Sequence, residues 1–307
     1  MMRAFQVAVS VARCAAVVQQ IAPKIRRTST LAVSEVRPPS EPVAPPLVIL
    51  HGLLGHARNF RSWAAALAPQ LAMTRRCISL DLVNHGDSFS RPSMDYEQMA
   101  DDVVATLDAL GIDEAAILGH SMGGKVAMMT AIKVPTRVER LCVFDMAPAK
   151  YSTADGSQWR ATRQVVEAMA GLDIAQLPDR RAADAKLAHS VLDPNIRAFA
   201  LSNLVASDDG LYWKCNLDAI IASLDTLSSW DVPDGLHYPG PTLFLAGAKS
   251  RYIRSVHLPD IGSSFPNFAL RTVANAGHWI HAEDPETTVE YTRDFLDTDH
   301  PTEENGG

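Results

Sequence analysis

Short apolar runs and longer amphipathic segments alternate along the chain from Pro46 onward. Buried strands of a parallel sheet read as uninterrupted apolar runs, whereas covering helices carry apolar residues at spacings of three and four. Such runs predict strands over residues 47–52, 77–83, 115–119 and 140–146. Helical spacing that ends in breakers or Gly predicts helices within residues 59–72 and 95–111. This part of the chain is therefore expected to form a parallel sheet covered by helices.

The alternation stops after Met146 and returns near residue 241. Between these points, residues 151–237 carry helical patterns only, and we call this segment the cap. Strands are predicted again over residues 241–247 and 268–277, followed by a last helix over 286–297. The pattern therefore predicts one α/β core with a mostly parallel sheet, interrupted by an inserted all-helical cap.

The N-terminal residues differ in kind from the rest of the chain. Residues 1–34 are basic, contain several Ser and Thr, and precede the first acidic residue, Glu35. This composition is typical of an organelle transit peptide and predicts mitochondrial import, with plastid import or secretion as alternatives. The expected division is a transit peptide and linker (1–40), a first core part (41–150), the cap (151–237), a second core part (238–297) and a polar tail (298–307).

Charge narrows the class of ligand. The chain has 28 basic and 35 acidic residues, and its net charge of −7 argues against a nucleic-acid partner and against an anionic membrane surface. No apolar run approaches the ~18 residues of a membrane-spanning helix, so none is expected. The four cysteines lack metal-binding spacing, and neither a metal site nor a disulfide framework is predicted. A small molecule is the expected partner.

Residues 119–123 read Gly-His-Ser-Met-Gly, a Gly-x-Ser-x-Gly motif. The motif follows a predicted strand and precedes a helical pattern over residues 123–134. A nucleophile elbow requires this setting, because its turn is so sharp that the residues two before and two after the serine must lack bulk. Ser121 is therefore predicted to be a catalytic nucleophile; a plain strand-to-helix turn is the alternative.

Two backbone N–H groups are expected to bind the oxyanion of a tetrahedral intermediate. The first free N–H groups of the helix after Ser121 point at the serine, and that of Met122 is one predicted donor. His51 and Gly52 end the predicted strand before the first helix, so the N–H of Leu53 is the second. A flexible strand end is the alternative interpretation of His51 and Gly52.

The general base should follow the last strand. His278 stands directly after Gly277 at that point, and His281 follows three residues later. We prefer His278 as the base, because it occupies the place that the mechanism predicts. His281 is expected to start the final helix or to pack near it.

The acid that orients the base is harder to assign. In hydrolases of this architecture it often follows the strand after the insertion, but Ala248, Lys249 and Ser250 stand there. Asp145 ends the preceding apolar strand, and a buried carboxylate there needs hydrogen-bond donors such as the His278 ring. Asp218 is the alternative acid, although it lies in the cap and could instead belong to a helix cap.

Several segments together resemble one family. The chain is similar to the esterase group of α/β-hydrolases that includes abhydrolase domain-containing protein 11 and bacterial relatives, and the similarity covers residues 46–297. The resemblance rests on HGLLGHARNF, LDLVNHGDS, GHSMGGKVAM, YWKCNLDAI, GPTLFLAG and VANAGHWIHAEDP. It implies the α/β-hydrolase fold, hydrolysis of acyl esters, no cofactor and a mitochondrial location in eukaryotic members. Proposals for the family's acid match both the Asp145 and the Asp218 positions.

The expected function is a serine esterase or thioesterase acting on a small acyl substrate. Trp159, Phe199, Tyr212 and Trp213 make the cap rich in aromatic residues, which favours either an apolar lid over an acyl group or simple packing between helices. A C–C hydrolase or an acyltransferase with the same triad is one alternative. A non-catalytic α/β-hydrolase that binds a ligand or a partner is another.

Overall fold

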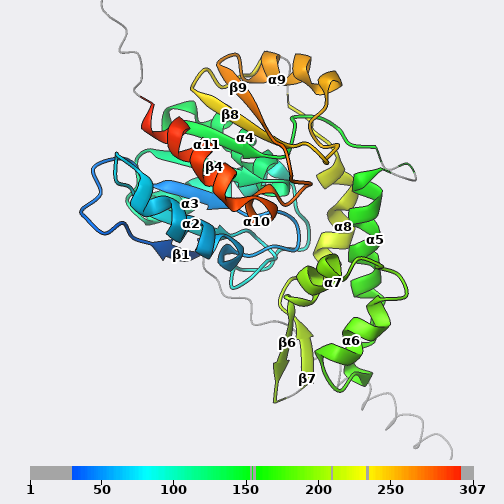
Figure 1. Cartoon of the computed structure of the whole chain (residues 1–307). Coiled ribbons are helices and arrows are strands. Elements are labelled where there is room, and N and C mark those ends of the chain that lie inside the picture. The colour runs from blue at the N-terminus through cyan, green and yellow to red at the C-terminus, as the bar shows by residue number, and fades with distance from the viewer. Residues whose placement is uncertain (1–29, 153, 155–156, 209, 233–234, 299–307) are drawn as a thin grey trace, which may run out of the picture.

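A mostly parallel seven-stranded sheet forms the centre of the molecule (Figure 1). The computed structural model describes residues 30–298, except 153, 155, 156, 209, 233 and 234. The strand order is β1-β3-β2-β4-β5-β8-β9, and only β1 runs antiparallel to its neighbour. The strands are β1 (Ala32–Val36), β3 (Cys77–Asp81), β2 (Leu47–Leu50), β4 (Ala115–His120), β5 (Val138–Phe144), β8 (Thr242–Gly247) and β9 (Phe268–Val273). The predicted parallel sheet is confirmed.

Helices cover both faces of this sheet. One face packs against α3 (Tyr96–Ala109), α4 (Met122–Lys133) and α9 (Leu258–Ser264), and the other against α2 (Arg61–Leu67) and α11 (Pro285–Asp297). Shorter helical segments are η1 (Ala57–Phe60), η2 (Ala68–Gln70), η3 (Pro135–Arg137), η5 (Ser255–His257) and α10 (Ile280–Glu283). None of the helices within the described residues is long and apolar enough to cross a membrane.

The apolar runs of the sequence supply both faces of the sheet at once. On β2, Val48 and Leu50 pack into the cluster on the α3 side, whereas Leu47 and Ile49 pack into the cluster on the α2 side. Successive side chains of a strand point to opposite faces, so a strand covered on both sides has to be apolar throughout. Burying each such side chain contributes about 1.5–3 kcal/mol.

The cap leaves the sheet between β5 and β8 and lies beside the core (Figure 1). It contains α5 (Gln158–Ala170), η4 (Ile174–Gln176), α6 (Arg180–Leu187), α7 (Pro194–Leu201), β6 (Leu204–Ser207), β7 (Gly210–Trp213) and α8 (Leu217–Ser228). The prediction of an all-helical cap is therefore wrong at β6 and β7, which form an antiparallel hairpin. The connection is short, because Ser207 at the end of β6 pairs with Gly210 at the start of β7, and Gly210 has φ 112°, a conformation that favours glycine.

Two kinds of contact join the cap to the core. Apolar side chains of α5 and α8, including Val166 and Leu224, belong to the same buried cluster as α3 and α4. Lys125 of α4 is fully buried and donates from Nζ to the carbonyl oxygens of Ser229 (2.6 Å) and Ser228 (3.4 Å), at the C-terminal end of α8. Burial lowers the pKa of Lys125 to about 7. The helix that begins beside Ser121 is thus bonded directly to the end of a cap helix.

The core begins before the predicted boundary at residue 41. The prediction that residues 1–40 are a transit peptide and linker is wrong for Ala32–Val36, which pair with β3 as an edge strand. Leu31 is buried, and its N–H donates to Thr106 Oγ1 (3.0 Å) on α3. The backbone partner lies more than 40 residues away, so this strand has little local signature. Residues 1–29 and 299–307, which hold most of the expected transit peptide and the expected tail, lie outside the described residues.

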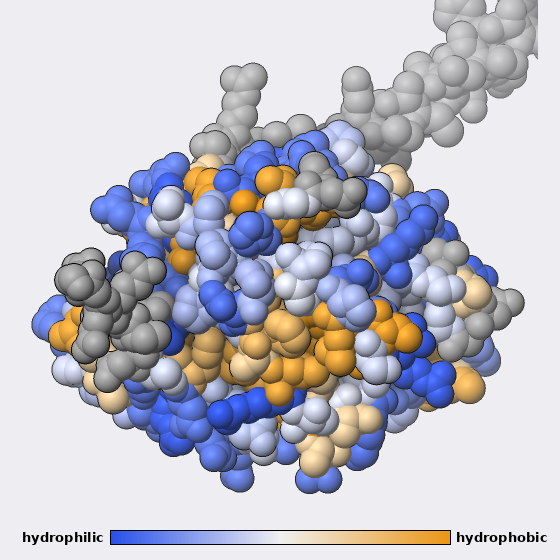
Figure 2. Space-filling view, turned by 90° about the horizontal axis from the view of Figure 1, so that it is seen from above, coloured by the Kyte–Doolittle hydropathy of each residue, from blue (hydrophilic) through white to orange (hydrophobic). Residues whose placement is uncertain are grey.

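The surface is not uniformly polar. On the face seen in Figure 2, hydrophobic residues form a central band with hydrophilic residues on both sides. Among the described residues, large exposed apolar side chains include Val256 on η5 and Leu258 on α9. Scattered exposed apolar residues are ordinary, whereas a contiguous band is typical of a surface that meets another molecule.

Candidate active site

Ser121 lies in the sharp turn between β4 and α4. Its backbone has φ 54° and ψ −120°, a conformation that costs a non-glycine residue about 1–3 kcal/mol. A Cβ placed on Gly119 would stand 2.1 Å from the carbonyl oxygen of Gly123, and one on Gly123 would stand 2.4 Å from that of Leu50. Close backbone contacts therefore exclude a Cβ at Gly119 and at Gly123, and this explains why the motif has glycine at both positions.

His278 lies between Ser121 and Asp145. Its Nε2 is 2.9 Å from Ser121 Oγ, and its Nδ1 is 2.7 Å from Asp145 Oδ2. A carboxylate oxygen accepts, so Nδ1 carries the proton and Nε2 is free to accept from the serine hydroxyl. The three residues follow β4, β5 and β9, whose carboxyl ends meet at one edge of the sheet. Three predicted site residues are thus brought together.

Asp145 is fully buried and surrounded by donors. Besides His278, the N–H of Gly247 donates to its Oδ1 (3.0 Å), and the Ser250 hydroxyl donates to its Oδ2. A buried carboxylate is costly unless such hydrogen bonds compensate the lost water. Ser250 stands after β8, where hydrolases of this architecture often carry the acid. The position after β8 therefore carries a hydroxyl donor, Ser250, and the carboxylate that it binds follows the neighbouring strand β5.

Asp218 lies elsewhere. It is exposed in the first turn of α8, and its carboxylate has no hydrogen-bond or ion-pair partner among the described residues. Asn216, two residues earlier, caps α8 by accepting from the N–H of Ala219 (3.2 Å). The structure does not bring Asp218 to His278, and a carboxylate at a helix N-terminus has an ordinary favourable interaction with the helix dipole.

The predicted oxyanion donors lie on two sides of Ser121. Met122 is the first residue of α4, where a backbone N–H has no acceptor within the helix. A turn over residues 52–55 passes directly beside the serine, because a Cβ on Gly52 would stand 3.1 Å from Ser121 Cβ. The carbonyl of Gly52 accepts from His51 Nδ1 (2.8 Å) and Gly55 N (2.9 Å). In a trans peptide the N–H points opposite to the C=O, so these bonds fix the direction of the Leu53 N–H.

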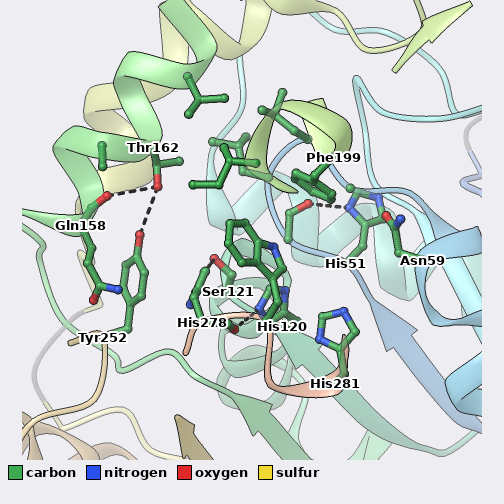
Figure 3. A pocket seen from close by; sticks show the side chains of 18 of the residues that line it. His51, Asn59, His120, Ser121, Gln158, Thr162, Phe199, Tyr252, His278 and His281 are labelled. Atoms are coloured by element: carbon green, nitrogen blue, oxygen red, sulfur yellow. Dashed lines mark hydrogen bonds between the residues drawn. The ribbon is translucent and has the colours of Figure 1, made fainter. Parts of the chain in front are cut away.

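Ser121 and His278 open into a cavity of about 200 Å³ (Figure 3). The view shows Gln158, Thr162 and Tyr252 on one side of the serine and His51, Asn59 and Phe199 on the other. Two cap aromatics named from the sequence, Trp159 and Phe199, line the cavity, whereas Tyr212 and Trp213 do not. Its apolar lining consists mainly of Leu53, Leu54, Phe60, Trp159, Val165, Ile196, Phe199 and Trp279. The site is therefore suited to an apolar group next to the serine.

Sequence reasoning missed further residues around His278. His120 lies with Nε2 2.9 Å from the carbonyl oxygen of His278, so that ring nitrogen donates and holds the main chain at His278. The Tyr252 ring packs against the His278 ring at 4.2 Å between centroids. His120 is the variable residue of the Gly-x-Ser-x-Gly motif and Tyr252 belongs to no motif, so no local signal marks either one.

His281 has a packing role. Its ring stacks on Phe60 at 4.2 Å between centroids, and burial lowers the pKa of His281 to about 3. A histidine with such a pKa stays neutral at physiological pH, and Ser121 bonds to His278 instead. Within the part of the chain that the structure describes, no group of three or more His, Cys, Asp or Glu side chains could hold a metal ion.

Comparisons with known proteins identify one family of relatives. The family described as alpha/beta hydrolase fold matches residues 45–285. The mouse protein named sn-1-specific diacylglycerol lipase ABHD11 is 38% identical over 256 residues, covering 82% of this chain and 81% of the relative. Esterase YbfF of Escherichia coli is 31% identical over 252 residues, covering 82% and 92%. A solved marine microorganism esterase superposes with a TM-score of 0.80 at 31% identity, covering 87% of this chain and 100% of that one.

Proposed function

The chain belongs to the α/β-hydrolase family and is a carboxylic ester hydrolase, and we propose that it cleaves acyl esters or thioesters through a covalent acyl-enzyme on Ser121. One observation carries the proposal: the hydrogen-bonded series from Ser121 through His278 to the buried Asp145 ends at an apolar cavity. Fluorophosphonates phosphonylate activated serines, so this series also predicts reactivity with such probes.

The geometry supports a two-step acyl transfer. Ser121 Oγ attacks the acyl carbonyl carbon while His278 Nε2 takes the hydroxyl proton, and Asp145 stabilises the resulting imidazolium. The N–H groups of Leu53 and Met122 bind the oxyanion, an interaction worth about 10²–10³ in rate per donor. Collapse of the intermediate expels the alcohol or thiol, which receives the proton from His278. Water, activated by the same base, then attacks the acyl-enzyme and releases the acid and free Ser121.

We propose an acyl glycerolipid as the substrate class. The mouse relative is named a diacylglycerol lipase, and the cavity wall next to Ser121 is predominantly apolar. At about 200 Å³, the cavity is smaller than the ~300–1,000 Å³ of typical ligand pockets, so it is expected to bury one acyl chain and not a whole diacylglycerol. The remainder of the substrate would lie outside the cavity.

The test is substrate profiling of the purified protein. We expect a fluorophosphonate probe to label it at one site, and we expect hydrolysis of p-nitrophenyl esters, acyl-CoAs and diacylglycerol to depend on acyl length. Adding an alcohol acceptor separates hydrolysis from transfer, because an acyltransferase would form the new ester in preference to the free acid. A folded protein that neither reacts with the probe nor cleaves any of these substrates would contradict the proposal.

We also propose import into mitochondria, with plastids as the alternative. The basic, Ser- and Thr-containing composition of residues 1–34 supports this proposal. A fluorescent protein fused behind residues 1–40 is expected to colocalise with a mitochondrial marker, and replacing the five Arg and Lys residues of positions 1–34 by Gln should abolish import. A diffuse cytosolic signal from the unmodified fusion would refute the targeting proposal.

A further inference from the structure

The turn over residues 52–55 contains a strained residue at its centre. Leu54 has φ 61°, a left-handed conformation that Gly or Asn normally supplies in a turn of this kind. The turn is closed by the bond from Gly55 N to the Gly52 carbonyl (2.9 Å). Because no Gly stands at the strained position, other groups have to hold this turn in its conformation.

Two buried side chains form hydrogen bonds with the backbone of Leu54, one with its N–H and the other with its carbonyl oxygen. His85, from the loop after β3, accepts from the Leu54 N–H at Nε2 (3.1 Å). Asn203, from the cap, donates from Nδ2 to the Leu54 carbonyl (2.8 Å). Asn203 and His85 are each only 1% exposed, so neither bond competes with bulk water.

Both side chains are themselves fixed. The Nδ1 of His85 lies 2.9 Å from the Val83 carbonyl, which requires the proton on Nδ1 and leaves Nε2 as an acceptor. Asn203 follows α7, and its carbonyl accepts from the N–H of Lys214 (2.8 Å) at the base of the cap hairpin. The Asn203 side chain thus binds Leu54 from a residue whose backbone is itself hydrogen-bonded within the cap.

We propose that Asn203 is a positioning residue for catalysis: together with His85 it holds the 52–55 turn so that the Leu53 N–H faces the oxyanion, and docking of the cap thereby completes the active site. The proposal rests on the proposed roles of Ser121 and Leu53. Without the Asn203 donor, the Leu54 carbonyl is buried and unpaired, and the turn gains freedom to relax from its strained conformation. The predicted consequence is a weaker oxyanion site, with substrate binding unchanged.

The experiment compares Asn203→Ala and Asn203→Asp with wild type. Asp keeps the shape of Asn but supplies no donor to a carbonyl when ionised. We expect kcat to fall about 10- to 100-fold with KM within about twofold, because losing a whole oxyanion donor costs about 10²–10³. The affinity of an alkyl trifluoromethyl ketone, which forms a tetrahedral adduct with serine, should fall by the same factor as kcat/KM.

Lys214→Ala is the matched control. Lys214 also joins the cap to the core, through an ion pair from Nζ to Asp87 (2.9 Å), but among the described residues its side chain makes no hydrogen bond or ion pair with the 52–55 turn. We expect its kcat and its ketone affinity to stay within twofold of wild type. Rates are expressed per site labelled by fluorophosphonate at long times, so partial unfolding of a variant does not enter the comparison.

Two results in the Asn203 variants would overturn the proposal. One is wild-type kcat and ketone affinity in both Asn203 variants; the other is a rise in KM alone, which would make Asn203 part of the binding wall only. Equal losses in Lys214→Ala would also overturn it, because the effect would then follow cap docking in general. Activity that survived Ser121→Ala would instead defeat the proposed function itself, which keeps the two failures distinct.

Discussion

Ser121→Ala is expected to lower kcat for ester hydrolysis by about 10⁴–10⁶ and to abolish labelling by a fluorophosphonate. The serine hydroxyl is the only group that His278 Nε2 contacts by a hydrogen bond among the described residues. Removing it leaves no nucleophile for the acyl-enzyme, while the oxyanion donors and the cavity persist. The residual rate should therefore still exceed the rate of uncatalysed ester hydrolysis in water, because the remaining groups continue to bind the transition state.

The control for this variant is Ser62→Ala, at an exposed serine on α2 that is not among the residues lining the cavity. It should retain wild-type kcat and full labelling. Ser121→Ala should also retain its thermal midpoint, because Ala adopts the same backbone conformation as Ser and only one partly buried hydroxyl is lost. A Ser121→Ala protein that hydrolyses esters at more than a tenth of the wild-type rate would show that another nucleophile operates.

Asp145→Asn is expected to lower kcat by about 10⁴, with little change in KM. The amide retains the shape of the carboxylate, but it carries no charge to stabilise the imidazolium. Its NH₂ group can also face His278 Nδ1, which moves the ring proton to Nε2 and leaves no base facing Ser121. The kinetics of single-turnover acylation should report the loss directly.

Asp218→Asn is the matched comparison, because it makes the same chemical change at the alternative acid. Its carboxylate is exposed in the first turn of α8, and Asn is tolerated there, so activity within twofold of wild type is expected. The reverse order, with Asp218→Asn inactive and folded while Asp145→Asn stays active, would transfer the role of the acid to Asp218. Equal small effects would indicate that neither carboxylate orients His278.

Local sequence carries much information about this site because each site residue ends a strand. Ser121 and His278 both stand where an apolar run gives way to Gly, and parallel strands bring such ends to one edge of the sheet. The motif around Ser121 also requires Gly119 and Gly123 for close backbone contacts, so its residue types reflect a local geometric need. These features could be predicted from pattern alone.

Other features could not be predicted because their partners are distant in the chain. The strand β1 has a weak apolar pattern and exists through pairing with β3. The cap hairpin is a different case: it pairs locally, but its strands are short and lie within a segment whose other elements are helices. Ser250 binds Asp145 across 105 residues, and Asn203 binds Leu54 across 149. Such long-range hydrogen bonds do not alter the pattern of hydrophobic and polar residues in either segment.

The sequence by itself determined the alternating α/β core, the sharp strand-to-helix turn at Ser121 and the position of His278 after the last strand, since these depend on hydrophobic periodicity and on glycines needed within one turn. Only the tertiary structure distinguished Asp145 from Asp218. Asp145 contacts His278 Nδ1 and accepts from the Gly247 N–H, and sequence spacing does not reveal such contacts between distant residues. It also decided which cap residues line the cavity and which ones hold the 52–55 turn. Those contacts form when the cap packs against the core, and that packing sets their geometry.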